Sequence, residues 1–285
     1  FGLGGTNAHL ILEEAPMPKN RPVFQRENAE PELFILSAKS ENALAQFTTK
    51  LKAFIEANTD VSINQIAANL ACNKKAFKIR KCLIVSGVND FSKGSLFMEK
   101  HTLDSKKMTF LFPGGGAQYL QMAKGIYESI GYFKKTLDTC FDHVREHFNI
   151  DLFEAVYGSD NDKINQPTNA LPALFAIEYS LAKLWQHWGI QPTQMLGHSM
   201  GEYAAACISG VITWQEGLSI VVKRGQLFDS LPTEGGMISI QASAEQIKAI
   251  LLKELSIAVI NKPDSCVVSG RVAAIESFKS LLVEK

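Results

Sequence analysis

The sequence predicts an α/β protein in its middle part, where two strands each run into a turn and a helix. A strand over 108–112 leads into the glycine-rich turn 113–118 and a helical pattern. A second strand over 194–196 leads into Gly197-His198-Ser199-Met200-Gly201 and a helix over 202–208. The segment 235–285 alternates strands and helices in the order βαββα, which predicts a ferredoxin-like subdomain without its final strand.

The region before residue 108 predicts a small α+β unit. The run Leu10-Ile11-Leu12 predicts a strand over 9–14, and four prolines in 16–31 indicate an extended linker. Ser40 then offers a helix cap, and apolar residues recur after it at helical spacing. The predicted elements are a strand over 33–37, helices over 40–57 and 63–72, and a strand over 81–86. We find no catalytic constellation in this unit.

Apolar spacing predicts the remaining elements. Helices are expected over 131–149 and 171–188, and further helices run from the serine motif to about Leu231. The final segment predicts strands over 235–240, 257–261 and 266–270, with helices over 244–254 and 273–284.

Composition excludes several classes of function. Lys plus Arg and Asp plus Glu number 29 each, so the protein has no net field to attract nucleic acid or an anionic membrane. The sequence has no apolar run near the roughly 18 residues of a membrane span and no signal-peptide pattern. The five cysteines are odd in number and lack Cys-x-x-Cys spacing, which favours free thiols. We therefore expect a cytoplasmic protein that binds neither nucleic acid nor membrane.

The Gly-x-Ser-x-Gly pentapeptide centred on Ser199 is typical of a nucleophile elbow. In such a turn the serine hydroxyl is exposed at the N-terminus of the next helix, which stabilises negative charge. The flanking residues are expected to be glycine because a Cβ atom would clash in so tight a turn. The nucleophile also needs a base, which in hydrolases with this elbow is a histidine later in the chain. None of the six histidines follows Ser199, so either the base is unusual or the chain stops before reaching it, and we expect a slice of a longer polypeptide.

A second histidine motif points to different chemistry. The run His143-Val144-Arg145-Glu146-His147 fits the H-x-x-E-H pattern of some zinc proteases, and both histidines would lie on one helical face. The helix is rich in charge, and no third ligand stands out in the sequence. We therefore expect no metal site there.

Taken in order along the chain, these segments resemble the acyltransferase domain of a modular type I polyketide synthase. Residues 1–16, FGLGGTNAHLILEEAP, are similar to the C-terminal tail of a ketosynthase domain, and 17–107 to the ketosynthase–acyltransferase linker. Residues 108–234 resemble the large acyltransferase subdomain, and 235–285 its ferredoxin-like small subdomain, incomplete here. The resemblance implies an α/β-hydrolase-like core with a truncated small subdomain, preceded by a small α+β linker domain.

The resemblance also implies roles for individual residues. Ser199 of GHSMGE matches the acyl-carrying nucleophile, and the backbone N–H groups of Gln118 and Met200 match the oxyanion hole. Arg224 matches the arginine that pairs with the free carboxylate of an extender unit, because a guanidinium fork binds carboxylate bidentately. The further substrate-binding residues implied are His198, Gly116 and Asn261.

The reaction implied is acyl transfer in two steps. Ser199 attacks the thioester of malonyl-CoA, coenzyme A leaves, and the acyl group passes to the phosphopantetheine thiol of an acyl carrier protein. No cofactor is expected on this segment itself, and the flanking ketosynthase domain of the same polypeptide is a further partner. Methylmalonyl-CoA remains an alternative donor. Met200 favours malonyl, because family members that select methylmalonyl often have glutamine there.

Three alternatives stay open. A serine esterase or thioesterase of the α/β-hydrolase type shares the elbow, but it would use water as the acceptor and would not need Arg224. A non-catalytic scaffold would use 33–105 as its working surface and would tolerate Ser199→Ala. An acyltransferase of fatty acid synthesis is the third alternative, although the segment 1–107 argues against a stand-alone form.

Overall fold

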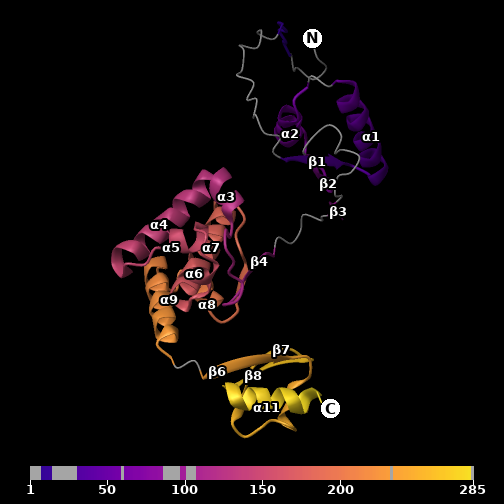
Figure 1. Ribbon diagram of the computed structural model, residues 1–285. Helices are drawn as coiled ribbons and strands as arrows, with labels where there is room; N and C mark the ends of the chain where they lie inside the picture. Colours follow the sequence, from indigo (N-terminus) through magenta and orange to yellow (C-terminus); the bar gives the residue numbers. More distant parts are fainter. Residues whose placement is uncertain are drawn as a thin grey trace. The chain divides into compact units, whose positions relative to one another are not determined.

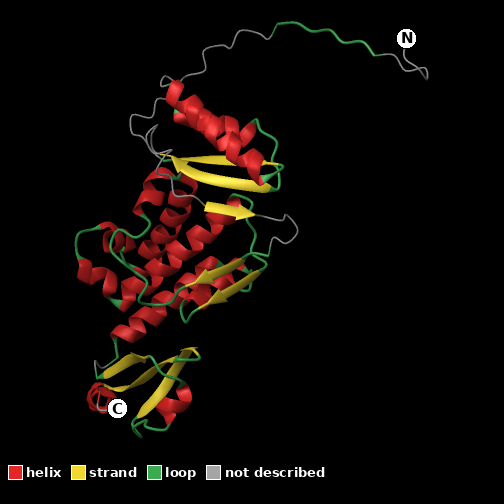
Figure 2. Cartoon of the chain, turned by 90° about the vertical axis from the view of Figure 1, so that its right-hand side faces the viewer, coloured by secondary structure: helices red, strands yellow, loops and turns green. Residues whose placement is uncertain are grey.

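The computed structural model describes residues 8–14, 31–58, 61–85, 97–100, 107–231 and 234–283. The chain divides into two compact units, Phe1–Lys106 and Lys107–Lys285 (Figure 1). The described residues form three sheets, which are one antiparallel sheet in the first unit and two sheets in the second (Figure 2).

In the first unit, two helices pack against one face of a three-stranded sheet. The alternation of the first strand places Phe34 and Leu36 in the core, whereas Leu33 lies on the other face and is 50% exposed. Ser40 caps the first helix, because its Oγ accepts a hydrogen bond from a first-turn N–H group. The elements are β1 (Glu32–Ala38), α1 (Glu41–Ala57), α2 (Ile63–Cys72), β2 (Ile79–Val85) and β3 (Phe97–Lys100).

The expected strand over 9–14 is wrong. Residues 8–14 form no strand, and Leu10, Ile11 and Leu12 are 82–90% exposed. A strand needs a neighbour for its N–H and C=O groups, and none of the described strands pairs with this segment. β3 is an element that the sequence did not predict, because four residues are too few to show a period. The rest of the expected ketosynthase tail and most of the proline-rich linker lie outside the described residues.

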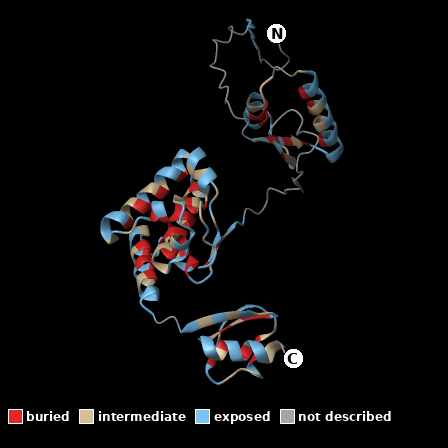
Figure 3. Ribbon diagram, in the orientation of Figure 1, coloured by how far each residue is buried: buried red, intermediate tan, exposed pale blue. Residues whose placement is uncertain are grey.

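The large part of the second unit is built around α7, which is continuously buried from Ala170 to Glu178. A helix that is buried all round belongs at the centre of a domain. The helices α4 and α9 pack against it, and Figure 3 shows the buried residues gathered where these helices face one another. The helices are α3 (Lys124–Ser129), α4 (Gly131–Phe148), α5 (Leu152–Tyr157), α6 (Asn161–Asn165), α7 (Pro167–His187), α8 (Gly201–Ile208) and α9 (Trp214–Asp229).

A two-stranded parallel sheet lies against this helical core. Strands β4 (Thr109–Phe112) and β5 (Gln194–Gly197) pair so that Phe112 is opposite Gly197. Both strands therefore end at the same edge of the sheet. The glycine-rich loop after β4 and the serine turn after β5 leave that edge together, which is where parallel α/β sheets place their sites.

Helix boundaries in this part differ from expectation in one respect. The helix expected from residue 171 begins at Pro167, with Gln166 as its N-cap. Proline suits the first helical position because its missing N–H would have no partner there. The helical pattern expected after the glycine-rich turn is the short helix α3, whereas α5 and α6 were not predicted, since five or six residues are too few for a helical period to appear.

The C-terminal part has the strand and helix order that the sequence predicts. The sheet order β6-β8-β7, antiparallel throughout, is that of a ferredoxin-like arrangement. The helix expected over 244–254 is shorter and ends at Lys248. The apolar run 250–252 that follows packs into the core, and three consecutive residues cannot share one helical face. The elements are β6 (Gly235–Ile240), α10 (Ala244–Lys248), β7 (Leu255–Lys262), β8 (Ser265–Arg271) and α11 (Val272–Val283).

The α/β class predicted from the sequence is thus confirmed. Within the described ranges, no helix has both the length and the apolar character needed to cross a bilayer.

Candidate active site

The turn between β5 and α8 holds Ser199 in a backbone conformation that is rare for a residue with a side chain. Its φ is +50°, in the left-handed region, and the residue is exposed. Such a conformation costs on the order of 1–3 kcal/mol and persists only where the surroundings impose it. Met200, the next residue, is 1% exposed and anchors the turn in the core. The elbow predicted from the pentapeptide is therefore present in the fold.

Both glycines of the elbow are required by close packing. A Cβ atom on Gly197 would lie well inside contact distance of the Glu202 backbone nitrogen. A Cβ atom on Gly201 would meet the carbonyl oxygen of Phe112 in the same way. The expectation that side chains cannot fit at these two positions is confirmed. The second clash shows that the start of α8 lies directly against the end of β4.

Two hydrogen bonds fix the elbow in place. The N–H of His198 donates to the Phe112 carbonyl at 2.8 Å, which extends the pairing of the two strands into the turn. The N–H of Gly197 donates to the Glu202 carboxylate at 2.9 Å. Glu202 lies in the first turn of α8, where its charge also interacts favourably with the helix dipole.

The glycine-rich loop after β4 lies beside the elbow. Gly114 is buried, and a Cβ atom there would lie 2.7 Å from the His198 carbonyl oxygen and 3.0 Å from its ring carbon Cδ2. The same atom would be 3.3 Å from the Cβ of Ser199. Gly114 was not among the predicted site residues. Its position directly after Pro113, which follows the last residue of β4, is the signal that could have identified it.

Gln118 and Gly116 form the outer part of that loop. The Gly116 N–H donates to the Gln118 side-chain oxygen at 2.7 Å, and Gly116 has a φ of +104° that favours glycine. The Gln118 side-chain amide reaches Asn165 at 3.4 Å. In the part of the chain that is described, neither the backbone N–H of Gln118 nor that of Met200 has a hydrogen-bond partner. Both donors are therefore free to bind an oxyanion.

Arg224, on α9, is held against the helix that follows the elbow. Its Nη1 donates to the hydroxyl of Tyr203 at 3.3 Å, and Tyr203 lies on α8, four residues after Ser199. The guanidinium also lies 5.2 Å from the centre of the Phe228 ring, one helical turn along α9. Sequence reasoning missed Tyr203 and Phe228, although each is four residues from a predicted site residue.

Asn261 lies on β7 in the C-terminal part of the chain and is exposed. No hydrogen bond joins it to the other predicted residues in the described portion of the structure. Its role next to Ser199 stays a prediction.

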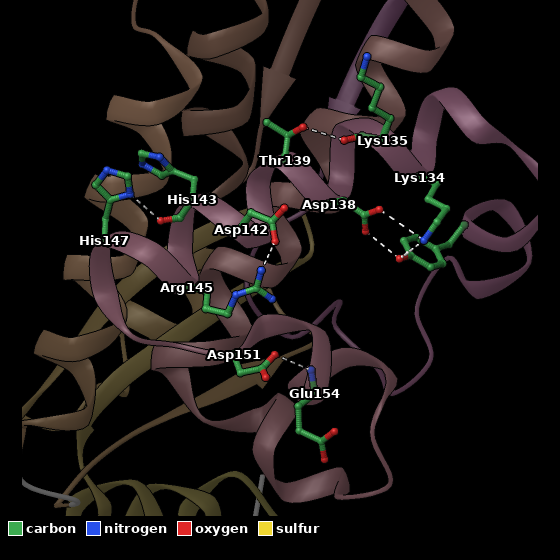
Figure 4. A network of polar contacts seen from close by, with 11 residues as sticks. Lys134, Lys135, Asp138, Thr139, Asp142, His143, Arg145, His147, Asp151 and Glu154 are labelled. Carbon is green, nitrogen blue, oxygen red and sulfur yellow. Dashed lines mark hydrogen bonds and ion pairs between the residues drawn. The ribbon is translucent and has the colours of Figure 1, made fainter.

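The histidine pair on α4 has no metal-site geometry. The rings of His143 and His147 stack with centroids 4.2 Å apart, and one ring nitrogen of His147 lies 2.9 Å from the His143 carbonyl oxygen (Figure 4). Among the described residues, no three His, Cys, Asp or Glu side chains lie close enough together to hold a metal ion.

Two family models and several large polyketide synthases match the chain. The family described as "Acyl transferase domain" matches residues 109–284, and "CurL-like, PKS C-terminal" matches 32–94. The Mycobacterium marinum phenolphthiocerol synthesis polyketide synthase Pks15/1 is 32% identical over 299 residues, covering 100% of this chain and 14% of the relative. The erythronolide synthase EryA2 of Saccharopolyspora erythraea is 29% identical to this chain. The alignment covers 98% of this chain and 8% of EryA2. The chain thus spans a small fraction of these relatives.

Solved structures of acyl transferases are also similar to this chain in fold and sequence. The acyl transferase domain of ZmaA has a TM-score of 0.81 and 32% identity, covering 89% of this chain and 62% of that domain. The malonyl CoA-acyl carrier protein transacylase of Clostridium perfringens has a TM-score of 0.55 and 27% identity, covering 62% and 58%. The resemblance predicted from the motifs is confirmed: this chain belongs to the acyl transferase domain family, as found in polyketide synthases.

Proposed function

We propose that the chain transfers a malonyl-type extender unit from coenzyme A to the phosphopantetheine thiol of an acyl carrier protein, with Ser199 as the acyl carrier. The observation that carries the proposal is the exposed Ser199 held at a φ of +50° between β5 and α8. Strain of this kind is maintained at functional sites. Membership of the acyl transferase family supports the reaction class.

The first half-reaction acylates the serine. A general base removes the Ser199 Oγ proton while Oγ attacks the thioester carbonyl carbon. Charge develops on the carbonyl oxygen, and the free N–H groups of Gln118 and Met200 stabilise it, each by about 3–4 kcal/mol. The C–S bond breaks, and the coenzyme A thiol leaves with a proton. His198 and Gly116 line the acyl site in this proposal.

Arg224 selects the acyl group. A malonyl unit keeps a free carboxylate, and a guanidinium can bind it through two parallel hydrogen bonds. The contacts with Tyr203 and Phe228 support this role because they orient the guanidinium before substrate arrives. Asn261 is assigned to the same pocket by its match to the family motif alone.

The second half-reaction releases the product. The phosphopantetheine thiol of the acyl carrier protein attacks the acyl-serine carbonyl, the ester C–O bond breaks, and Ser199 regains its proton. The Clostridium perfringens transacylase supports this donor and acceptor, since its name describes malonyl CoA and acyl carrier protein. In this proposal the phosphopantetheine cofactor belongs to the acyl carrier protein, and the chain acts in the cytoplasm.

Intact-protein mass spectrometry tests the nucleophile. The polypeptide that contains this chain is incubated with malonyl-CoA, and the Ser199→Ala variant should lose the acyl adduct completely. Ser209→Ala is the matched control, because Ser209 is an exposed serine at the other end of α8. An adduct that persists in Ser199→Ala would exclude this residue as the carrier.

A second set of variants tests selection. With equal concentrations of malonyl-CoA and acetyl-CoA, Arg224→Ala should reduce the malonyl-to-acetyl adduct ratio at least about tenfold, the effect of losing one charge-assisted contact. Lys223→Ala should leave the ratio unchanged, since this neighbour is exposed on the same helix. Rapid hydrolysis of every adduct, indifferent to Arg224, would instead identify an esterase or thioesterase.

A further inference from the structure

The guanidinium of Arg224 forms no ion pair with any of the described residues. Arg224 is half-buried, and its one hydrogen bond in the described structure goes to the neutral hydroxyl of Tyr203, at 3.3 Å. Its Cζ lies 5.2 Å from the centre of the Phe228 ring. A partly buried positive charge is costly unless a negative group pairs with it. The guanidinium is thus available to an anion that this segment does not itself supply.

The carboxylates nearest to this site along the chain are already engaged. Asp229, the last residue of α9, accepts hydrogen bonds from the backbone N–H of Thr168 at 3.0 Å and from the Thr168 hydroxyl. These bonds join the end of α9 to the start of α7. Glu202, in the first turn of α8, accepts the Gly197 N–H at 2.9 Å. Both acids therefore stabilise the fold and leave Arg224 unpaired.

The hydroxyl of Tyr203 has an unused donor beside that guanidinium. A phenol hydroxyl can accept one hydrogen bond and donate another. Here it accepts from Arg224, and its own O–H has no acceptor among the described residues. The ring packs against the hydrophobic core of the second unit, so the side chain is held in place independently of Arg224. Tyr203 lies on α8, the helix that begins at the elbow, four residues after Ser199.

We propose that Tyr203 is a further specificity-determining residue, whose hydroxyl donates a hydrogen bond to the free carboxylate of the extender unit while Arg224 binds the same group. This inference rests on the role proposed for Arg224 above, and it gives Tyr203 a task beyond orienting the guanidinium. A carboxylate has two oxygens and about four acceptor positions, so it can accept a guanidinium fork and one O–H group together. An acetyl group has no acceptor at that position, so the hydroxyl favours malonyl-type over simple acyl groups.

Equilibrium binding to the Ser199→Ala form of the natural polypeptide tests this contact without any acyl transfer. Dissociation constants for malonyl-CoA and acetyl-CoA are measured by isothermal titration calorimetry, and their ratio reports recognition of the carboxylate. Tyr203→Phe removes the hydroxyl and keeps the ring that packs in the core, so the fold persists. It should reduce the preference for malonyl-CoA about tenfold, the effect of one charge-assisted hydrogen bond. An unchanged ratio would overturn the proposal.

The matched control is Tyr132→Phe, which also removes one phenol hydroxyl. Tyr132 lies on α4, a helix that supplies none of the predicted site residues, so the ratio should remain that of the parent protein. A parent protein that binds the two thioesters equally well would contradict the proposal too, because neither side chain would then recognise the carboxylate.

The Arg224→Ala background separates a direct contact from a positioning role. If the Tyr203 hydroxyl bonds to the carboxylate itself, adding Tyr203→Phe to Arg224→Ala should lower the malonyl preference by a further factor of at least about three. If Tyr203 acts only by orienting the guanidinium, the second substitution should have no effect, and the proposal is wrong. Failure of the proposed transfer reaction is a separate result: a protein that binds malonyl-CoA through Tyr203 but forms no adduct on Ser199 would retain this contact without the reaction.

Discussion

The two sides of strand β4 differ in how many of the polar groups beside them have a hydrogen-bond partner among the described residues. At the end of the strand, the Phe112 carbonyl accepts a hydrogen bond from the His198 N–H and packs against Gly201. Along the other edge of β4, Leu111 is exposed, and the buried Glu178 carboxylate has no hydrogen-bond partner among the described residues. The N–H groups of Gly197 and His198 in the elbow thus have partners within this segment, whereas the carboxylate beside the other edge has none among the described residues.

Substitution at the elbow should have the largest effect on stability. A Cβ atom at Gly201 would overlap the backbone of Phe112, which cannot move without breaking the pairing of the two strands. Gly201→Ala should therefore lower the free energy of unfolding by about 3 kcal/mol and abolish acylation. Urea denaturation checks the first effect. Gly125→Ala is the control: nothing lies within 4 Å of a Cβ there, so alanine should be neutral or slightly stabilising.

Glu178 should have a smaller and pH-dependent effect. Its pKa of about 8 in the fold is above its ordinary value, so its contribution to stability is full below about pH 4.5 and is lost as the pH rises toward 8. Glu178→Gln removes this titration. As the pH rises from 5 to 8, the free energy of unfolding of the variant should increase by on the order of 2 kcal/mol relative to that of the unsubstituted 285-residue chain. Parallel stability curves in urea at the two pH values would show that Glu178 already has a partner.

The hydrogen bond between Gly197 and Glu202 should have the smallest effect. Glu202→Ala removes the acceptor of the Gly197 N–H and a favourable first-turn charge, which together are worth about 1 kcal/mol. Glu202→Gln retains an oxygen that can accept the bond and should recover about half of the loss. Thermal melting of the three proteins tests this order. Equal melting temperatures for the alanine and glutamine variants would assign the effect to charge alone.

The same contrast explains what the sequence could predict. Ser199 and its flanking glycines were recognisable because a tight turn permits few residue types. The turn therefore leaves a characteristic motif in the sequence. Gly114 and Tyr203 were missed because their importance comes from contacts between segments far apart in the chain. A glutamate in an apolar helix has no local signature that distinguishes a buried carboxylate from a solvated one.

Secondary structure, too, was predicted where the signal is local and missed where it is not. Long helices with a clear N-cap leave a local signal of helix in the sequence. Examples are α1, capped by Ser40, and α9, which has a capping box at Thr213. The expected strand over 9–14 had a local signal but lacked a neighbour, and strand formation depends on that neighbour. Short elements such as β3 and α6 contain too few residues for a periodic signal to appear in the sequence.

Mapping the acyl group to a residue tests the central claim most directly. The protein is mixed with malonyl-CoA, quenched in acid within seconds, digested and sequenced by tandem mass spectrometry. The account predicts a malonyl ester on Ser199, in the peptide that contains Gly197-His198-Ser199-Met200-Gly201. A malonyl group found on a cysteine or any other residue, with Ser199 unmodified, would contradict it.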